Sequence, residues 1–241
     1  MEFAKLNQPT NRSEKFRAVS PALEHYTDDA LLNGVWKRGE LSRRDRSLVT
    51  CAALIARLQT VDMPYYFALA LDSGLKPSEL SETITHLAFY SGWPNAMAAV
   101  VVAAELFQSR HVTQRDLPPA KDKLLQLNEA AETHRAALVI SMVGSTTPGL
   151  MQNTTELLFR DLWLRPALAP RDRSLVTVTA LVASGQVAQV PFHLNRAMDS
   201  GLTASEAGEV LTHVAFYAGW PCCFSAAPVF KEVIEKRPKQ E

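Results

Sequence analysis

The stretch RDRSLVT occupies residues 44–50 and returns unchanged at residues 171–177. The offset between the two copies is 127 residues (171 minus 44), and the same offset relates THLAFYSGWP at residues 85–94 to THVAFYAGWP at residues 212–221. Sequence similarity that recurs at one fixed spacing, with no gap, indicates a duplicated structural unit. The sequence therefore predicts two tandem copies of one unit.

The two units, here called repeat 1 and repeat 2, are expected to span residues 16–110 and 143–237, with a connector at residues 111–142. The segment 121–142 of the connector carries apolar residues three and four positions apart, which predicts a helix. This helix could serve as a spacer between the repeats, or it could pack over a pocket.

Each repeat is expected to be a small antiparallel helical bundle, because sustained apolar alternation is absent and glycine and proline fall between segments of helical period. Gly74 and Gly201 are positioned to end equivalent helices. Thr203 with Glu206 forms a capping-box pattern that predicts the start of the next helix, and a final helix is expected over residues 222–236. The predicted fold class is all-α.

The composition excludes several classes of protein. Lys plus Arg and Asp plus Glu number 25 each, so no net charge favours nucleic acid or an anionic membrane. The longest apolar run, residues 96–104, is far shorter than the roughly 20 residues that span a bilayer. The three cysteines Cys51, Cys222 and Cys223 cannot build a disulfide scaffold. A cytoplasmic protein with no membrane or nucleic-acid partner is expected.

Both repeats carry a polar trio at four-residue spacing on one helix. Its members are Glu82, His86 and Tyr90 in repeat 1 and Glu209, His213 and Tyr217 in repeat 2. Residues four apart share one helix face, so each trio could line a pocket or could be a buried histidine held by its neighbours. One such face supplies only two metal ligands, so no metal site is expected.

The repeats differ in the segment that precedes Gly74 and Gly201. His193, Asn195 and Arg196 of repeat 2 are replaced by Tyr66, Ala68 and Leu69 in repeat 1, and Gln189 is replaced by Asp62. Repeat 1 has therefore either lost a site or buried this face in an interface. Because an unperturbed histidine has a pKa of about 6.5, His193 is the strongest candidate for an acid or base at neutral pH.

The RDRSLVT stretch, the PFH at residues 191–193 and the helix ending in THVAFYAGWP together resemble the carboxymuconolactone decarboxylase family, which is related to alkylhydroperoxidase D. The resemblance covers most of both repeats. It implies an all-helical fold that assembles into rings, commonly of six units. A chain with two units would then form a homotrimer with pseudo-sixfold symmetry.

The peroxidase branch of that superfamily uses a Cys-x-x-Cys motif ahead of its histidine. Here Gln186 and Gln189 stand at the two cysteine positions, counted back from His193. Glutamine cannot form the thiolate that attacks a peroxide, so an alkylhydroperoxidase-like antioxidant is disfavoured.

The decarboxylase branch keeps the histidine, and the resemblance implies a cofactor-independent lyase acting on a small lactone or keto acid. The candidate catalytic residues are His193 as general acid/base and Gln186 and Gln189 as amide donors to the developing enolate. The candidate substrate-binding residues are Arg173, Arg196, His213, Tyr217 and Trp220. The alternative is a ring-forming protein that binds a small acid without turning it over.

Overall fold

The computed structural model describes residues 9–238, and all regular structure in that range is helical, without a β-strand. The helices are α2 (Pro9–Val19), α3 (Pro21–Tyr26), α4 (Arg43–Ala56), α5 (Met63–Asp72), α6 (Pro77–Ser91), α7 (Trp93–Ser109), α8 (Glu129–Val143), α9 (Pro148–Asn153), α10 (Pro170–Ala183), α11 (Val190–Asp199), α12 (Ala204–Ala218) and α13 (Trp220–Lys236). The predicted all-α class is confirmed.

The duplication extends to the bounds of the helices. Each element from α3 to α7 returns 127 residues later as an element from α9 to α13, so that α4 at Arg43–Ala56 corresponds to α10 at Pro170–Ala183. Short π-helical turns at Thr27–Leu32 and Thr154–Phe159 obey the same offset. The tandem repeat predicted from the sequence is therefore present in the structure.

The predicted helix ends follow the local sequence. Thr203 Oγ1 accepts a hydrogen bond from the N–H of Glu206 (3.1 Å), and Glu206 Oε2 accepts one from the N–H of Thr203 (2.7 Å), which completes the capping box. Gly201 adopts a φ of 104°, a conformation that suits glycine. The last helix begins at Trp220 rather than at residue 222, because a proline fits the first turn of a helix.

The connector helix is shorter than predicted. Helix α8 begins at Glu129, whereas the apolar spacing suggested a helix from residue 121. Asn128 caps this start, since its Oδ1 accepts the N–H of Ala131 at 3.0 Å. Ahead of the cap the chain is not helical, and the N–H of Leu125 donates to the carbonyl oxygen of Leu164 at 2.7 Å. A contact with repeat 2 thus replaces the first turns of the expected helix.

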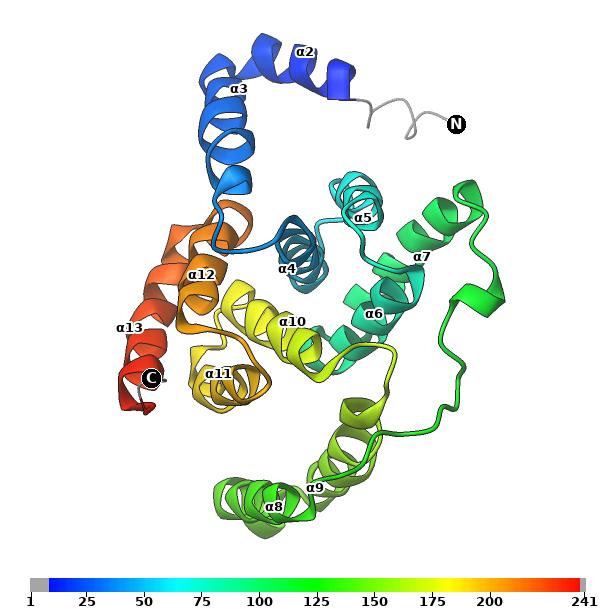
Figure 1. The fold of residues 1–241 in the computed structure, drawn as a ribbon, viewed down its shortest axis with the longest axis vertical. Coiled ribbons are helices and arrows are strands. Elements are labelled where there is room, and N and C mark those ends of the chain that lie inside the picture. The colour runs from blue at the N-terminus through cyan, green and yellow to red at the C-terminus, as the bar shows by residue number, and fades with distance from the viewer. Residues whose placement is uncertain (1–8, 239–241) are drawn as a thin grey trace.

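The two repeats pack through their central helices, α4 and α10, which lie against each other (Figure 1). Helix α12 of repeat 2 packs on α4 of repeat 1, and α6 of repeat 1 packs on α10 of repeat 2. Buried side chains from both repeats form one hydrophobic cluster. Each central helix is therefore covered partly by the partner repeat, and any site on it draws residues from both repeats.

A reciprocal ion-pair network joins the first turns of α4 and α10. Arg44 Nη2 lies 2.7 Å from Asp172 Oδ2, and Arg171 Nη2 lies 2.9 Å from Asp45 Oδ2. Burial, the largest single effect, lowers the pKa of both arginines, but the hydrogen bonds and charges of the surrounding carboxylates together outweigh it and raise both pKa values. The repeated RDRSLVT stretch thus supplies the polar part of the contact between repeats.

Replacing both Arg44 and Arg171 with methionine is expected to lower the free energy of unfolding by about 3–5 kcal/mol, because two buried carboxylates, Asp45 and Asp172, lose their partners. Urea unfolding measures the change. The matched control is Arg110→Met, since Arg110 pairs with Asp72 at the surface with 45% of its side chain exposed, and its loss should stay within about 0.5 kcal/mol. Equal losses in the two variants would contradict a structural role for the network.

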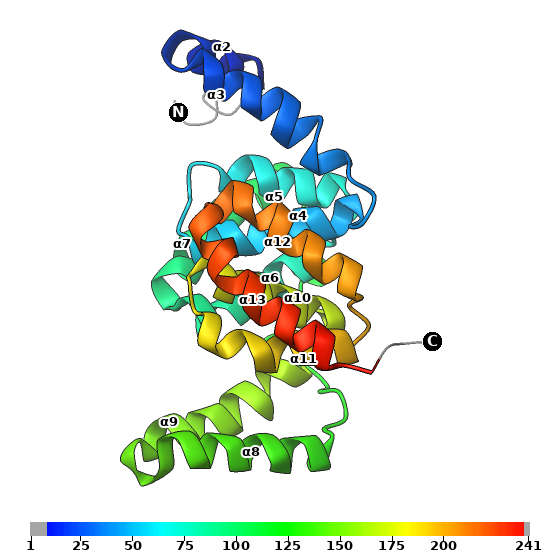
Figure 2. The same cartoon turned by 90° about the vertical axis from the view of Figure 1, so that its left-hand side faces the viewer.

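Two helical arms project from opposite ends of the bundle (Figures 1 and 2). The N-terminal arm contains α2, α3 and the turn that follows, residues 9–32, and the connector arm contains α8, α9 and the turn that follows, residues 129–159. In the described part of the chain, none of the helices combines the length and apolar character needed to cross a bilayer.

Candidate functional site

A buried polar cluster lies where α6 of repeat 1 packs on α10 of repeat 2. Arg173 Nη2 lies 3.0 Å from Glu82 Oε1, and Arg173 Nη1 lies 3.2 Å from His86 Nδ1. His86 Nε2 lies 2.7 Å from Thr177 Oγ1. All four side chains are fully buried, so this cluster depends on both repeats.

These contacts fix the protonation of His86. A guanidinium can only donate, so Nδ1 of His86 accepts from Arg173. Thr177 Oγ1 donates its own hydrogen to the carbonyl oxygen of Arg173 at 2.8 Å, so it accepts from Nε2. Burial and the charge of Arg173 hold the pKa of His86 well below its usual value. His86 is therefore a neutral, fully bonded side chain.

The same arrangement occurs with the repeats exchanged. His213 lies 2.8 Å from Thr50 Oγ1 and 3.4 Å from Arg46 Nη1, and Arg46 pairs with Glu209 at 2.8 Å. Trp36 Nε1 donates to the hydroxyl of Tyr217 at 2.8 Å. His213 and Tyr217 are thus grouped with residues of repeat 1. The predicted set of binding residues is divided between two places in the fold.

His193 lies on α11 beside residues of both repeats. Its ring stacks on Trp163 (centroids 5.7 Å apart, 14° between planes) and meets the edge of Tyr90 from repeat 1 (5.2 Å, 87°). Only 7% of His193 is exposed, and its Nδ1 is buried without a hydrogen-bond partner in the described structure. Burial, and secondarily Arg196, lowers the pKa of His193 to about 3.

This pKa changes the role expected for His193. Without a ligand the imidazole is neutral at pH 7, whereas the usual histidine pKa had suggested that it could be protonated there. A neutral imidazole can accept a proton or donate a hydrogen bond, but it cannot act as a cationic acid. A bound anion would offset the charge of Arg196 and raise the pKa of His193 again.

Arg196, one turn after His193, lies over the ring of Trp163, with its Cζ 4.0 Å from the ring centroid. The described residues give it neither a hydrogen bond nor an ion pair, and burial lowers its pKa. A half-buried guanidinium without a carboxylate partner is well suited to bind an anion. Tyr90, Trp163, His193 and Arg196 are called the His193 cluster below.

The connector arm packs against this cluster. Arg135 of α8 lies over the ring of Phe159 at 4.5 Å, and Phe159 in turn stacks on Trp163 (6.0 Å, 6°). Arg135 is only 4% exposed and pairs with Glu132 at 2.6 Å, yet its Nη1 has no partner in the described structure. A second cationic group therefore lies next to the His193 cluster.

The remaining predicted residues lie at the periphery. Gln186 and Gln189 are exposed in the turn before α11, and within the described chain their side chains make no hydrogen bond. Trp220 is 52% exposed at the start of α13 and contacts Phe216 (5.0 Å). Arg173 lies in the buried cluster with His86. The structure thus groups His193 and Arg196, and it leaves the two glutamines and Trp220 at the surface.

Tyr66 takes the place of His193 in repeat 1. It stacks on Trp36 (6.2 Å, 13°) and meets the edge of Tyr217 (5.3 Å, 87°), in nearly the geometry of His193 with Trp163 and Tyr90. The aromatic frame is therefore duplicated, while the imidazole at this position is found only in repeat 2.

The three cysteines are free, and Cys51 and Cys223 are buried. Burial raises the pKa of the Cys51 thiol strongly, and it raises that of Cys223 to about 11. Neither of these two thiols is a ready thiolate at neutral pH. Among the residues that the structure describes, no three His, Cys, Asp or Glu side chains are placed to hold a metal ion.

Three histidines that are held neutral make stability depend on pH. His86, His193 and His213 have depressed pKa values in the folded protein, whereas unfolded histidine binds a proton below about pH 6.5. The unfolded state therefore gains protons as the pH falls. The free energy of unfolding should fall by about 1.4 kcal/mol per histidine between pH 7.5 and 5.5.

Urea unfolding of the wild type and of His193→Tyr at both pH values tests this expectation. The variant lacks one of the three histidines. Between pH 7.5 and 5.5 its free energy of unfolding should therefore fall by about 1.4 kcal/mol less than that of the wild type. Equal losses in the two proteins would mean that His193 titrates normally in the folded state.

The fold and the site define a class of protein: a duplicated helical bundle in which each polar cluster is built from both repeats. The chain belongs to the carboxymuconolactone decarboxylase family, whose model matches residues 21–105 and 148–232. The two matched regions are again related by 127 residues.

Two known proteins are similar to parts of this chain. A 4-carboxymuconolactone decarboxylase of Acinetobacter baylyi is 35% identical over 75 residues, which are 31% of this chain and 56% of that protein. A nitrosuccinic acid decarboxylase of Metarhizium robertsii is 32% identical over 89 residues, which are 37% of this chain and 62% of that protein. The matches therefore span less than two thirds of either relative.

Proposed function

We propose that the chain is a cofactor-independent decarboxylase that acts on a small carboxylic acid at the His193 cluster. The observation that carries the proposal is the guanidinium of Arg196, which is stacked on Trp163 at 4.0 Å and has no carboxylate partner among the described residues. Membership of the family and the decarboxylase activities of the two relatives support the same reaction class.

The reaction requires one bond to break and one proton to arrive. The bond between the carboxylate carbon and its neighbour breaks and carbon dioxide leaves. The electron pair passes into a conjugated electron-withdrawing group of the substrate, giving an enolate where that group is a carbonyl and a nitronate where it is a nitro group. Arg196 binds the anionic acid and then stabilises the enolate, because its charge acts in a poorly solvated place. Trp163 and Tyr90 restrict water around the reacting carbon.

His193 delivers the proton in this proposal. Burial is the larger cause of the low pKa of His193, and the charge of Arg196 is the smaller one. A carboxylate bound at Arg196 opposes both, because it offsets the guanidinium charge and attracts a proton from solvent to the imidazole. That proton passes to the enolate carbon after carbon dioxide has left. Gln186 and Gln189, exposed at the turn before α11, are the proposed amide donors to the enolate oxygen.

Arg135 is a candidate for a second anionic group of the substrate. Its guanidinium lies over Phe159 beside the cluster, and one of its terminal nitrogens lacks a partner in the described structure. A substrate with two acidic groups could bind Arg196 and Arg135 together. The substrates named for the two relatives, 4-carboxymuconolactone and nitrosuccinic acid, are the first acids to test.

Carbon dioxide release from these two acids and from a panel of β-keto and lactone acids tests the function. Release that rises to saturation with substrate supports a decarboxylase. Saturable binding without release would favour the alternative, a protein that holds a small acid without converting it. A dependence of turnover on pH that disappears in His193→Gln would assign the chemistry to His193.

A homotrimer is proposed for the assembly. Helices α7 and α13 expose large apolar side chains, which favour association between chains. They are Trp93, Met97, Val101, Trp220 and Phe224. Light scattering on the purified chain should give three times the chain mass of 26.6 kDa. A single-chain mass at micromolar concentration would contradict this assembly.

A further inference from the structure

The hydroxyl group of Tyr90 has a hydrogen left to donate. Trp163 Nε1 lies 2.9 Å from the Tyr90 oxygen, and an indole N–H can only donate, so the phenol oxygen is the acceptor of this bond. The hydroxyl hydrogen of Tyr90 meets no acceptor within the described part of the chain. It is therefore available to a ligand.

The phenol of Tyr90 keeps its proton at neutral pH. Burial raises the pKa of Tyr90, and the hydrogen bond from Trp163 and the charge of Arg196 lower it by less. A neutral phenol donates a hydrogen bond but does not repel an anion as a phenolate would. Tyr90 is therefore suited to bind a negatively charged oxygen.

Trp163 brings this donor close to the anion-binding group. The edge of its indole donates to the Tyr90 hydroxyl, while the guanidinium of Arg196 lies over its ring with Cζ 4.0 Å from the centroid. Tyr90 and Arg196 each alter the pKa of the other. Both side chains are partly exposed, so a solute can reach them.

His193 adds a third polar group at the same place. Its ring meets that of Tyr90 at 87°, with centroids 5.2 Å apart, and its Nδ1 is buried without a partner in the described structure. Buried polar groups in folded proteins are normally hydrogen-bonded. The unused hydrogen of Tyr90, the Nδ1 of His193 and the guanidinium of Arg196 together indicate a polar ligand that contacts all three.

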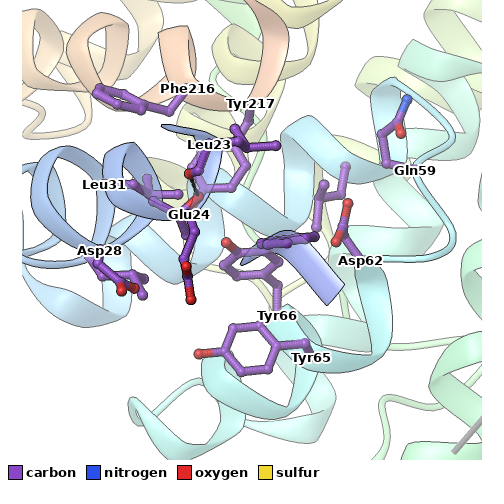
Figure 3. Close-up of a pocket in the computed structure, with 14 residues that line it drawn as sticks. Leu23, Glu24, Asp28, Leu31, Gln59, Asp62, Tyr65, Tyr66, Phe216 and Tyr217 are labelled. Atoms are coloured by element: carbon purple, nitrogen blue, oxygen red, sulfur yellow. Dashed lines mark hydrogen bonds between the residues drawn. The ribbon is translucent and has the colours of Figure 1, made fainter. Parts of the chain in front are cut away.

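Tyr217 is the counterpart of Tyr90, and its surroundings differ. It accepts the indole N–H of Trp36 at 2.8 Å, so its hydroxyl has the same support. It faces Tyr66 instead of a histidine, with centroids 5.3 Å apart, and Tyr66 adds to the effect of burial in raising the pKa of Tyr217 (Figure 3). Leu69 replaces the arginine there. Tyr217 therefore lies apart from the His193 cluster and lacks its imidazole and its guanidinium.

We propose that Tyr90 is a further catalytic residue of the His193 cluster, whose hydroxyl donates a hydrogen bond to the substrate oxygen that becomes negatively charged as carbon dioxide leaves. The electron pair of the broken carbon–carbon bond moves onto this carbonyl or nitro oxygen, and Tyr90 binds the oxygen without losing its proton. A donor aimed at developing charge acts mainly on the transition state. This inference rests on the proposed decarboxylase function and adds a residue of repeat 1 to it.

Binding of a nitronate tests the donor without turnover. Loss of carbon dioxide from the nitro-bearing carbon of nitrosuccinic acid leaves the nitronate of 3-nitropropionate, which carries the charged oxygen. Tryptophan fluorescence of the full chain measures its affinity, with 3-nitropropionate in the nitro form for comparison. We expect Tyr90→Phe to weaken nitronate binding at least about tenfold and binding of the nitro form less than about threefold.

The matched control is Tyr217→Phe, which removes a hydroxyl with the same tryptophan bond. It should leave both affinities unchanged, and circular dichroism and thermal unfolding should show equal folding of the two variants. Three outcomes would overturn the proposal: no saturable nitronate binding by the wild type, equal weakening of the nitronate and the nitro form in Tyr90→Phe, or equal weakening of nitronate binding by both variants.

Carbon dioxide release by the same proteins separates this inference from the decarboxylase itself. Tyr90→Phe should lower kcat by about 10²–10³-fold and change KM little, because the bond strengthens only as charge develops. Undiminished release by Tyr90→Phe would reject the role of Tyr90 and leave the decarboxylase standing. If the wild type releases no carbon dioxide but prefers the nitronate, and Tyr90→Phe abolishes that preference, the donor role stands and the decarboxylase does not.

Discussion

Replacing His193 with tyrosine is expected to lower kcat/KM for carbon dioxide release by about 10²–10⁴-fold, the range for loss of a general acid or base. Tyrosine is chosen because Tyr66 already occupies the equivalent place, stacked on Trp36 at 6.2 Å. The fold therefore accommodates this ring, and the thermal midpoint should change by only a few degrees. Steady-state assays and thermal unfolding of the same preparations give both quantities.

The control for this substitution is His25→Tyr, which makes the same chemical change at an exposed histidine on the N-terminal arm. It should leave kcat/KM unchanged. If His193→Tyr keeps full activity and stability, the imidazole takes no part in the reaction. If it unfolds the protein, the correspondence between Tyr66 and His193 does not extend to packing.

Replacing Arg196 with leucine is expected to lower kcat/KM by about 10–150-fold, because a hydrogen bond to a charged group contributes about 1.5–3 kcal/mol. Leucine is the residue at the equivalent position of repeat 1, Leu69. Much of the loss should appear as a higher KM, since Arg196 binds the acid before the reaction begins. Arg196→Lys keeps the positive charge but loses the planar, two-pronged guanidinium. Its kcat/KM should therefore lie between that of the wild type and that of Arg196→Leu.

Binding of a ligand that does not react separates a loss of substrate binding from a loss of acid/base catalysis. Titration with succinate as a non-reacting diacid should show weaker binding in Arg196→Leu and nearly normal binding in His193→Tyr. Unchanged KM and unchanged succinate affinity in Arg196→Leu would remove Arg196 from the binding site. The carboxylate would then have to be held elsewhere, with Arg135 the next candidate.

The fold could be predicted from the sequence because its signals are local or repeated. The recurrence of RDRSLVT predicted the duplication, and the Thr203 and Glu206 pattern predicted a capping box that the structure contains. The connector helix was predicted too long. Its apolar spacing continues ahead of Asn128, but the Asn128 cap and the contact of Leu125 with Leu164 decide where the helix begins.

The grouping of site residues could not be predicted, because the 127-residue offset says nothing about which repeat packs on which. His213 lies beside Arg46 of repeat 1, and Tyr90 of repeat 1 lies beside His193. Tyr90 and Trp163 were therefore missed as neighbours of His193. The signal that could have found them is their own recurrence as Tyr217 and Trp36, but recurrence alone does not pair elements in space.

The charge of the residues around Tyr66 in repeat 1 also depends on tertiary structure and could not be predicted from the sequence. Comparison of the two segments indicated that repeat 1 had lost a site or buried this face in an interface, since Leu69 replaces Arg196 there. The N-terminal arm folds over that face and adds Glu24 and Asp28. These residues lie far upstream of the compared segment, so only the folded chain shows that their carboxylates line the same space as Tyr66.

Decarboxylation at the His193 cluster is tested most directly by carbon dioxide release from 4-carboxymuconolactone, nitrosuccinic acid and a panel of β-keto and lactone acids, with wild type and Arg196→Leu assayed side by side. If the decarboxylase proposal holds, the wild type should release carbon dioxide saturably from at least one acid, and the variant should release it at least tenfold more slowly. Release that is undiminished in Arg196→Leu, or no release from any acid by the wild type, would contradict it.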